Sequence, residues 1–455
     1  MNRVFARKTF SRIGLGSSFF LACSALLGCG SSASSGDATS AGAPSTAAGG
    51  SAVIASGGSA GSSIVASAGA SNVSGGAGNG VAGTSGVSGA SGASGASGAL
   101  GVGSGGSAGS ATSTPGASCT PPTTYANLFV SLLGQTQAAS DAKVTAAWSQ
   151  LFNPSGANTI FYNGPGSGEA YVEDVADNAV RSEGQSYGMM IAVQLDHQAE
   201  FDALWTFVKN HMWKGNTISW QTSTSGSVTG SGGAPDGDEW FAAALLFAHK
   251  RWGDTSGKYD YGSEAQKTLD LVRTTDFSSS EHLVRYFTGT DSNGTDASYM
   301  LPAFYQTWAC FDTANADFWN TTLTTTRAWL QTAAGTTGNI GDQSSFAGKT
   351  TNSSGDDKLR TVANFMSDYN FFHADPFEAT YASEYATWVS SNSNGSTAMV
   401  ACNGLLGFGL PEATGKPFVQ KLWSAAIPTG TYRYYDGALY MIALLHVSGT
   451  FHLYY

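Results

Sequence analysis

Three short segments of the sequence carry carboxylic acids in settings that could support acid–base chemistry. The first is Arg181-Ser182-Glu183-Gly184-Gln185, where Ser182 is expected to cap a helix and Glu183 falls in the first turn. A carboxylate in that position is often only a favourable partner of the helix dipole. Spacing alone therefore leaves two readings of Glu183 open, a proton donor and a structural charge.

The second acidic segment reads Pro-Asp-Gly-Asp-Glu-Trp-Phe over residues 235–241, directly before an apolar helical pattern. Asp238 is a good candidate for the N-cap of that helix, so at least one of the three acids is expected to be structural. Three neighbouring acids could also bind Ca²⁺, but the alternation of ligands found in an EF-hand loop does not follow them. Asp236 and Glu239 are left as acids without a structural assignment.

The third segment is Asn-Phe-Met-Ser-Asp-Tyr-Asn-Phe-Phe over residues 364–372, and its acid is Asp368. Aromatic and apolar residues surround this carboxyl group along the chain. Burying an unpaired carboxylate is costly, so Asp368 is expected to be either paired or functional.

Composition narrows the class of protein. The 455 residues carry a formal net charge of −11, which argues against nucleic acid as a partner because phosphate recognition needs basic patches. The chain contains 59 Gly residues, more than a typical protein of this length, and most of the surplus lies before residue 118. The remainder is rich in aromatic residues and is long enough for one large domain.

The N-terminus has the pattern of an export signal. Basic residues lie between Arg3 and Arg12, and an apolar run over 13–27 is too short and interrupted for a convincing membrane span. The run ends in Leu26-Leu27-Gly28-Cys29, which resembles a bacterial lipobox, so Cys29 is predicted to be the lipidated first residue of the mature protein. The alternative is an ordinary signal peptide. The expected location is the outer membrane or cell surface, or the medium after release.

Residues 30–118 consist almost entirely of Gly, Ser, Ala, Thr and Val. Such a segment cannot bury enough apolar surface to offset its ordering entropy. It is predicted to be a disordered tether with a root-mean-square span of about 50 Å. The expected organisation is a signal peptide over 1–28, a linker over 29–118 and a catalytic domain over 119–455.

Three cysteines, Cys119, Cys310 and Cys402, remain after the signal peptide and lipobox. An odd number in an oxidising compartment permits one disulfide and one free thiol. The sequence does not decide the pairing, and three unpaired or partly paired structural cysteines are the default expectation. No Cys/His spacing suggests a metal site, and neither a metal nor another cofactor is expected.

From residue 121 onward the hydrophobic pattern is mainly helical. Apolar residues recur at helical spacing in predicted helices such as 184–196, 238–252, 302–311, 361–373 and 436–447. Strand-like stretches are few and short, at 159–162, 170–173 and 282–287. About a dozen helices separated by Gly-rich loops predict an all-α fold with an α/α barrel.

Together these motifs resemble glycoside hydrolase family 8. The similarity includes the Glu183 segment, the Asp236 segment with its helix to Gly253, Ala297–Tyr305, and the C-terminal Tyr432–Tyr440. It covers nearly all of residues 121–455, and the motifs occur in the family's order.

The resemblance implies an (α/α)6 barrel and an inverting mechanism with four site residues. It implies that Glu183 is the general acid and Asp368 the general base that activates water. Asp236 would bind and distort the sugar at the cleavage point, and Tyr299 would position the water. Inversion requires the acid and base to lie about 6.5–9.5 Å apart.

Sugar rings pack on aromatic side chains, so the cleft is expected to contain an aromatic platform. The candidates are Trp240, Trp220, Trp213 and Tyr434, with Trp240 favoured because it follows the acid cluster. With 11 Trp and 18 Tyr in the chain, any one of them is more often a core residue than a sugar subsite.

Xylan is the favoured substrate, because the Asp236 segment and the C-terminal motif look like those of xylan-active members. Some relatives release xylose from the reducing end of oligomers, using a Leu-His-Pro type loop that is not seen between Ala379 and Thr397. An open, endo-acting cleft is therefore predicted. The protein is also expected to be a monomer.

Four alternatives stay open. Two are enzymes, a reducing-end xylose-releasing exo-oligoxylanase and a β-1,4-glucanase. The third is a non-catalytic, oligosaccharide-binding surface lipoprotein, and the fourth a structural surface protein.

Overall fold

A computed structural model describes residues 119–289, 293–353, 357–392 and 395–455. The chain divides after residue 104 into two units, and every described residue belongs to the second. The predicted signal peptide, Cys29 and the tether lie outside the described residues. No helix in the described ranges is long and apolar enough to cross a membrane.

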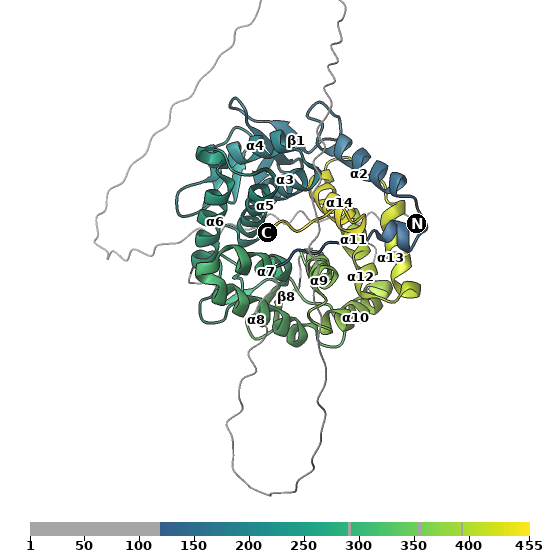
Figure 1. The fold of residues 1–455 in the computed structure, drawn as a ribbon. Coiled ribbons are helices and arrows are strands. Elements are labelled where there is room, and N and C mark those ends of the chain that lie inside the picture. The colour runs from purple at the N-terminus through teal and green to yellow at the C-terminus, as the bar shows by residue number, and fades with distance from the viewer. Residues whose placement is uncertain (1–118, 290–292, 354–356, 393–394) are drawn as a thin grey trace, which may run out of the picture. The chain divides into compact units, whose positions relative to one another are not determined.

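The described residues form two rings of helices, one inside the other (Figure 1). The inner ring consists of α3 (Ser182–Leu195), α5 (Pro235–Trp252), α7 (Pro302–Phe311), α9 (Leu359–Phe372), α11 (Thr397–Gly404) and α14 (Arg433–Val447). The outer ring consists of α2 (Gln137–Leu151), α4 (Gln198–Phe207), α6 (Tyr261–Thr275), α8 (Ala316–Ala334), α10 (Phe377–Asn392) and α13 (Glu412–Ser424). Short helices α1 (Leu128–Ser131) and α12 (Leu406–Gly409) complete the set. This arrangement confirms the predicted (α/α)6 barrel.

The two rings differ in which residues they bury. In α5 every residue from Pro235 to Ala248 is buried, as expected for a helix that is enclosed on all sides. In α6 of the outer ring, buried residues such as Ala265, Leu269 and Val272 recur at spacings of three or four. The outer helix therefore presents one apolar stripe to the inner ring.

Two small antiparallel sheets lie in the loops that lead into the inner helices. The first has five strands, β1 (Phe161–Asn163), β2 (Ala170–Asp174), β3 (Ala179–Arg181), β4 (Gln221–Ser223) and β5 (Val228–Gly230). The second has three strands, β6 (Gly294–Thr295), β7 (Gln343–Ser345) and β8 (Thr350–Asn352). Strand β3 runs directly into α3, so the first sheet fixes the start of that helix.

Several local predictions require correction. Helix α3 begins at Ser182 with Arg181 as N-cap, so Ser182 is not the cap. Helix α5 begins at Pro235, since proline favours the first helical position, and Asp238 lies inside the helix. The stretch 282–287 forms no strand and contributes only an isolated bridge between Val284 and Phe277.

The C-terminal segment packs where the inner helices α3 and α14 end, and the C-terminus lies inside the ring of helices in Figure 1. Phe451 is 1 % exposed and stacks on His446 at 4.0 Å between ring centres. The amide of Gln194, at the end of α3, donates to the carbonyl of His452 at 2.8 Å. These contacts fill the barrel where its inner helices end.

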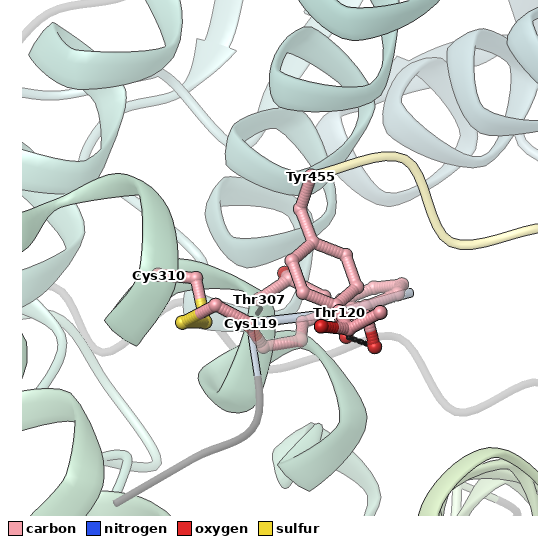
Figure 2. Close-up of a disulfide and its surroundings, with 6 residues drawn as sticks. Cys119, Thr120, Thr307, Cys310 and Tyr455 are labelled. Carbon is pink, nitrogen blue, oxygen red and sulfur yellow. Dashed lines mark hydrogen bonds between the residues drawn. A yellow bond between two sulfur atoms is a disulfide. The ribbon is translucent and has the colours of Figure 1, made fainter. Parts of the chain in front are cut away.

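A disulfide joins Cys119 to Cys310 near the end of α7 (Figure 2). Close to it, the hydroxyl of Tyr455 donates to the carbonyl of Thr120 at 3.3 Å. Cys402 is free and buried, and burial raises its pKa to about 12. The three cysteines are therefore partly paired, as one disulfide and one free thiol, which the sequence permitted without deciding the pairing.

Reducing this disulfide should lower the free energy of unfolding. The bond closes a loop across 191 residues, and removing a native disulfide typically costs about 2–5 kcal/mol. Urea unfolding with and without dithiothreitol measures the difference. A Cys402→Ala variant should respond to the reductant as the parent does, whereas Cys119→Ser/Cys310→Ser should not respond. An unchanged midpoint on reduction of the parent would contradict a stabilising role.

Candidate active site

Arg360, in the first turn of α9, brings three carboxyl groups together. Its Nη1 lies 2.8 Å from Oε2 of Glu183 and 3.0 Å from Oδ2 of Asp236, and its Nη2 lies 3.4 Å from Oδ1 of Asp357. The Arg360 side chain is only 2 % exposed. Burial opposes its positive charge, but the surrounding tyrosines and carboxylates outweigh burial and raise its pKa well above the usual value.

The three acids reach Arg360 from the starts of different inner helices. Glu183 lies in the first turn of α3, Asp236 in the first turn of α5, and Asp357 two residues before α9. Helix N-termini favour negative charge, so each helix stabilises its own acid. The cluster therefore holds three carboxyl groups around one guanidinium, and carboxyl groups are side chains that can act as general acid or general base.

Three tyrosine hydroxyls complete the cluster. Tyr434 donates to Oε1 of Glu183 at 3.0 Å, and Tyr435 donates to Oδ1 of Asp357 at 3.1 Å. The hydroxyl of Tyr187 accepts from Nη1 of Arg360 at 2.9 Å. Burial, the largest effect in each case, raises the pKa of all three tyrosines well above the usual value. All three hydroxyls therefore stay protonated, and those of Tyr434 and Tyr435 act as hydrogen-bond donors to the carboxyl groups.

Tyr299 lies beside the same arginine, as the sequence predicted for a site residue. Its ring centre is 5.5 Å from the Arg360 guanidinium, and its ring stacks on Tyr286 at 6.0 Å. One residue earlier, the hydroxyl of Ser298 accepts from Nη2 of Arg360 at 3.1 Å. Asp296 caps this turn from a fully buried position, where burial first and the charge of Asp357 second raise its pKa.

Asp368 does not join this cluster. It lies eight residues after Arg360, which is about 12 Å along the axis of α9. Its two carboxylate oxygens accept from Arg327 of α8 at 2.7 and 2.8 Å, and the side chain is 0 % exposed. A carboxylate that is sealed from solvent and bound at both oxygens cannot activate water. The prediction of Asp368 as general base is therefore corrected.

Asp357 lies at the Arg360 cluster, where Asp368 was expected from the sequence. Its side chain is 27 % exposed, compared with 13 % for Glu183, so both carboxyl groups can meet solvent or substrate. The two acids lie at different nitrogens of one guanidinium. A sequence signal for Asp357 did exist, since Glu183 and Asp236 were both expected at helix starts and Asp357 precedes the helix that begins at residue 359.

Trp240, the favoured sugar platform, is instead a core residue. It is 6 % exposed and packs edge-on against Tyr187 and Phe304 at 5.0 Å each. It lines a cavity of about 20 Å³ inside the barrel, which is room for a single water rather than a sugar ring. The platform role of Trp240 is corrected because the indole is enclosed by neighbouring side chains and offers no free face to a sugar ring.

The other aromatic candidates have separate environments. Tyr434 is 4 % exposed and its hydroxyl is engaged with Glu183, so its ring does not offer a free face to sugar. Trp220 is half-buried under the guanidinium of Arg181, and its carbonyl accepts from the first backbone amide of α3 at 2.9 Å. Trp213 is half-buried against Lys209 at 4.0 Å. Of the candidates, Trp220 is tied most directly to the start of α3.

Within the described ranges, no group of three or more His, Cys, Asp or Glu side chains is arranged to hold a metal ion. The acids at the site are instead spaced around Arg360, which already provides their positive charge. The local chemistry is that of carboxyl groups, tyrosine hydroxyls and one guanidinium.

An (α/α)6 barrel that gathers acidic side chains at the starts of its inner helices is typical of hydrolases that cleave glycosidic bonds. Residues 124–449 match the family model described as glycosyl hydrolases family 8. The chain belongs to this glycoside hydrolase family.

Similar proteins are known by sequence and by structure. A reducing-end xylose-releasing exo-oligoxylanase from Paenibacillus barcinonensis is 29 % identical, over 73 % of this chain and 97 % of the relative. Endoglucanase C from Ruminiclostridium cellulolyticum is 26 % identical, over 72 % of this chain and 75 % of the relative. The solved structure of a xylohexaose complex of a family 8 xylanase catalytic mutant from Teredinibacter turnerae superposes with a TM-score of 0.70 at 29 % identity, covering 73 % of this chain and 98 % of the other.

Proposed function

We propose that this protein hydrolyses β-1,4-xylosidic bonds at internal positions of xylan, with inversion at the anomeric carbon. The observation that carries the proposal is the placement of Glu183 and Asp357 at two nitrogens of the buried Arg360. Both carboxyl groups are partly exposed, and each also accepts a hydrogen bond from a tyrosine hydroxyl. This arrangement gives two acids with different partners, as acid–base catalysis needs.

In this mechanism Glu183 protonates the departing glycosidic oxygen while Asp357 removes a proton from the attacking water. The water adds to the anomeric carbon from the face opposite the leaving group, and the configuration inverts. Asp236, fixed by Arg360 at 3.0 Å and by the amide of Gly237 at 2.9 Å, binds the sugar at the cleavage point. Tyr299 packs beside Arg360 and positions the water.

Xylan is proposed as the substrate class because several similar proteins are named for xylose chains. These include the exo-oligoxylanases and the xylanase whose complex holds xylohexaose. Other relatives are named endoglucanases or a β-glucanase, which keeps a β-1,4-glucanase as the second candidate. The sequence motifs that resemble xylan-active members decide our preference.

Endo action is proposed because only residues 393–396 separate α10 from α11. So short a connection leaves little chain for a loop that could block one end of the cleft. The exo-acting alternative is favoured by the names of three relatives, which are all reducing-end xylose-releasing enzymes. The two modes differ in the products they release first.

The test is a time course on xylan, carboxymethylcellulose, lichenan and chitosan, with separation of the products. Mixed xylo-oligosaccharides appearing early from xylan would support the proposal. Xylose released only from short oligomers would replace it with the exo-oligoxylanase. Activity on none of the four polymers or on xylo-oligomers would leave the oligosaccharide-binding protein as the better account, and binding of Glu183→Gln to xylohexaose would then be measured directly.

We also propose that the protein is exported and anchored through Cys29, because the lipobox-like Leu26-Leu27-Gly28-Cys29 follows a basic and then an apolar stretch. A Cys29→Ser variant should lose incorporation of labelled fatty acid and leave the membrane fraction. Equal labelling of both forms would exclude the anchor.

A further inference from the structure

Glu183, the proposed general acid, accepts a hydrogen bond from the hydroxyl of Tyr434. Tyr434 lies in the first turn of α14, which packs against α3, and its hydroxyl donates to Oε1 of Glu183 at 3.0 Å. The other oxygen, Oε2, faces Nη1 of Arg360 at 2.8 Å. The two oxygens of the carboxyl group are therefore held from different directions by different chemistry.

The guanidinium of Arg360 and the hydroxyl of Tyr434 have different effects on where the proton of Glu183 is bound. A guanidinium has no acceptor, so it opposes a proton on the oxygen it faces and favours the proton on Oε1. That oxygen has two lone pairs, one for the tyrosine hydrogen bond and one for the proton. Loss of the proton to the glycosidic oxygen leaves a carboxylate whose Oε1 still accepts from Tyr434.

The neighbouring glycine gives a second, independent observation. A Cβ at Gly184 would lie 2.5 Å from Cε2 of Tyr434 and 2.8 Å from its hydroxyl oxygen. No side chain fits there without moving the phenol ring. Glycine is otherwise unfavourable inside a helix, by roughly 0.5–1 kcal/mol relative to alanine. Its presence beside Glu183 is explained if the site requires the ring of Tyr434 at that position.

Resting on the proposed role of Glu183, we propose that Tyr434 is a positioning residue for the general acid. It directs the acid's proton toward the leaving oxygen, with Gly184 providing the space. Tyr434 acts through Glu183 and does not stack on a sugar, in contrast to the platform role predicted from the sequence. Its burial, at 4 % exposure, and its protonated state are consistent with a fixed donor.

The test compares two substrates that differ in their need for a proton. Xylohexaose requires protonation of the leaving sugar, whereas the fluoride of β-xylobiosyl fluoride departs without a general acid. In Tyr434→Phe, kcat on xylohexaose should fall about 10-fold or more with little change in KM, because the positioning of a general acid is lost. Turnover of the fluoride should stay near the parent value.

Gly184→Ala should reproduce this pattern, since its Cβ displaces the same ring. Combining it with Tyr434→Phe should add little further loss, because both changes break one interaction. The matched control is Gly188→Ala in the same helix, whose Cβ would meet Val172 and Leu204 rather than the site. It should alter stability without making turnover depend on the leaving group.

Each other outcome would overturn the inference. A raised KM with unchanged kcat would make Tyr434 a sugar platform, and an equal loss on both substrates would make it only structural. An unchanged kcat on xylohexaose would show that the hydrogen bond does not position the acid. Glu183→Gln is measured in parallel, because its full activity on xylohexaose would refute the acid itself, a failure distinguishable from that of Tyr434.

Discussion

Replacing Asp357 with asparagine should reduce kcat on xylohexaose by about 10²–10⁴-fold, the usual contribution of a general base. Asparagine keeps the size of the side chain and can still accept from Tyr435 and Arg360, so the fold and substrate affinity should persist. The loss therefore reports the missing base. Steady-state kinetics with thermal unfolding of the same sample measures both quantities.

The matched control is Asp368→Asn, the same substitution in the same segment of chain. It should keep most of the turnover, because Asp368 lies apart from the Arg360 cluster and contacts Arg327. The assignment would be refuted if Asp368→Asn abolished turnover in a folded protein while Asp357→Asn remained active.

Asp368→Asn should instead cause a large loss of stability. Its carboxylate accepts two hydrogen bonds from Arg327 at 0 % exposure, and breaking a buried ion pair costs about 3–5 kcal/mol. Arg327 is 14 % exposed and would keep a charge with its main partner removed. Urea unfolding at neutral pH measures the change, and a midpoint equal to that of the parent would contradict a structural role.

Glu378→Gln, a substitution next to Asp368, should have the opposite effect on stability at high pH. Burial first and the charge of Asp368 second raise the pKa of Glu378 to about 11, so Glu378 is neutral in the folded state. Because the folded pKa lies above the unfolded value of 4.5, the stability linked to this proton is lost as pH rises from 4.5 through 11. Glutamine imitates the neutral form, so the variant should gain stability over the parent as pH rises.

The fold followed closely from the sequence because helical periodicity is a property of each segment on its own. The helices around Tyr187 and around residues 238–252 were predicted from the spacing of apolar residues and are present as α3 and α5. Helix starts were predicted less well. Helix α5 begins at Pro235, three residues before the predicted cap Asp238, because the fixed backbone angle of proline suits the first position of a helix.

The site was predicted in part, and the error has a physical cause. Glu183, Asp236 and Tyr299 all lie around Arg360. The resemblance to the family gave Asp368 the role of base, and its apolar setting allowed either a paired or a functional acid. The sequence cannot distinguish these, since its partner Arg327 comes from another helix. Asp357 lies next to polar and glycine residues, a context that looks like an ordinary loop.

Aromatic residues were the hardest to assign from sequence. Trp240 directly follows the acid cluster, but a helix turns successive side chains by about 100°, so sequence neighbours of a site residue need not face the site. The indole accordingly packs against Phe304 in the core. Tyr434 was identified as a site residue, but its contact with Glu183 depends on how α14 and α3 pack.

Proton NMR of xylohexaose during the first minutes of hydrolysis by the parent protein tests the inverting mechanism. Inversion by Glu183 and Asp357 predicts that the new reducing ends appear first as the α-anomer and that the β-anomer grows in only by mutarotation. Immediate appearance of the β-anomer would contradict the account, because retention needs a carboxylate nucleophile in place of a base that activates water.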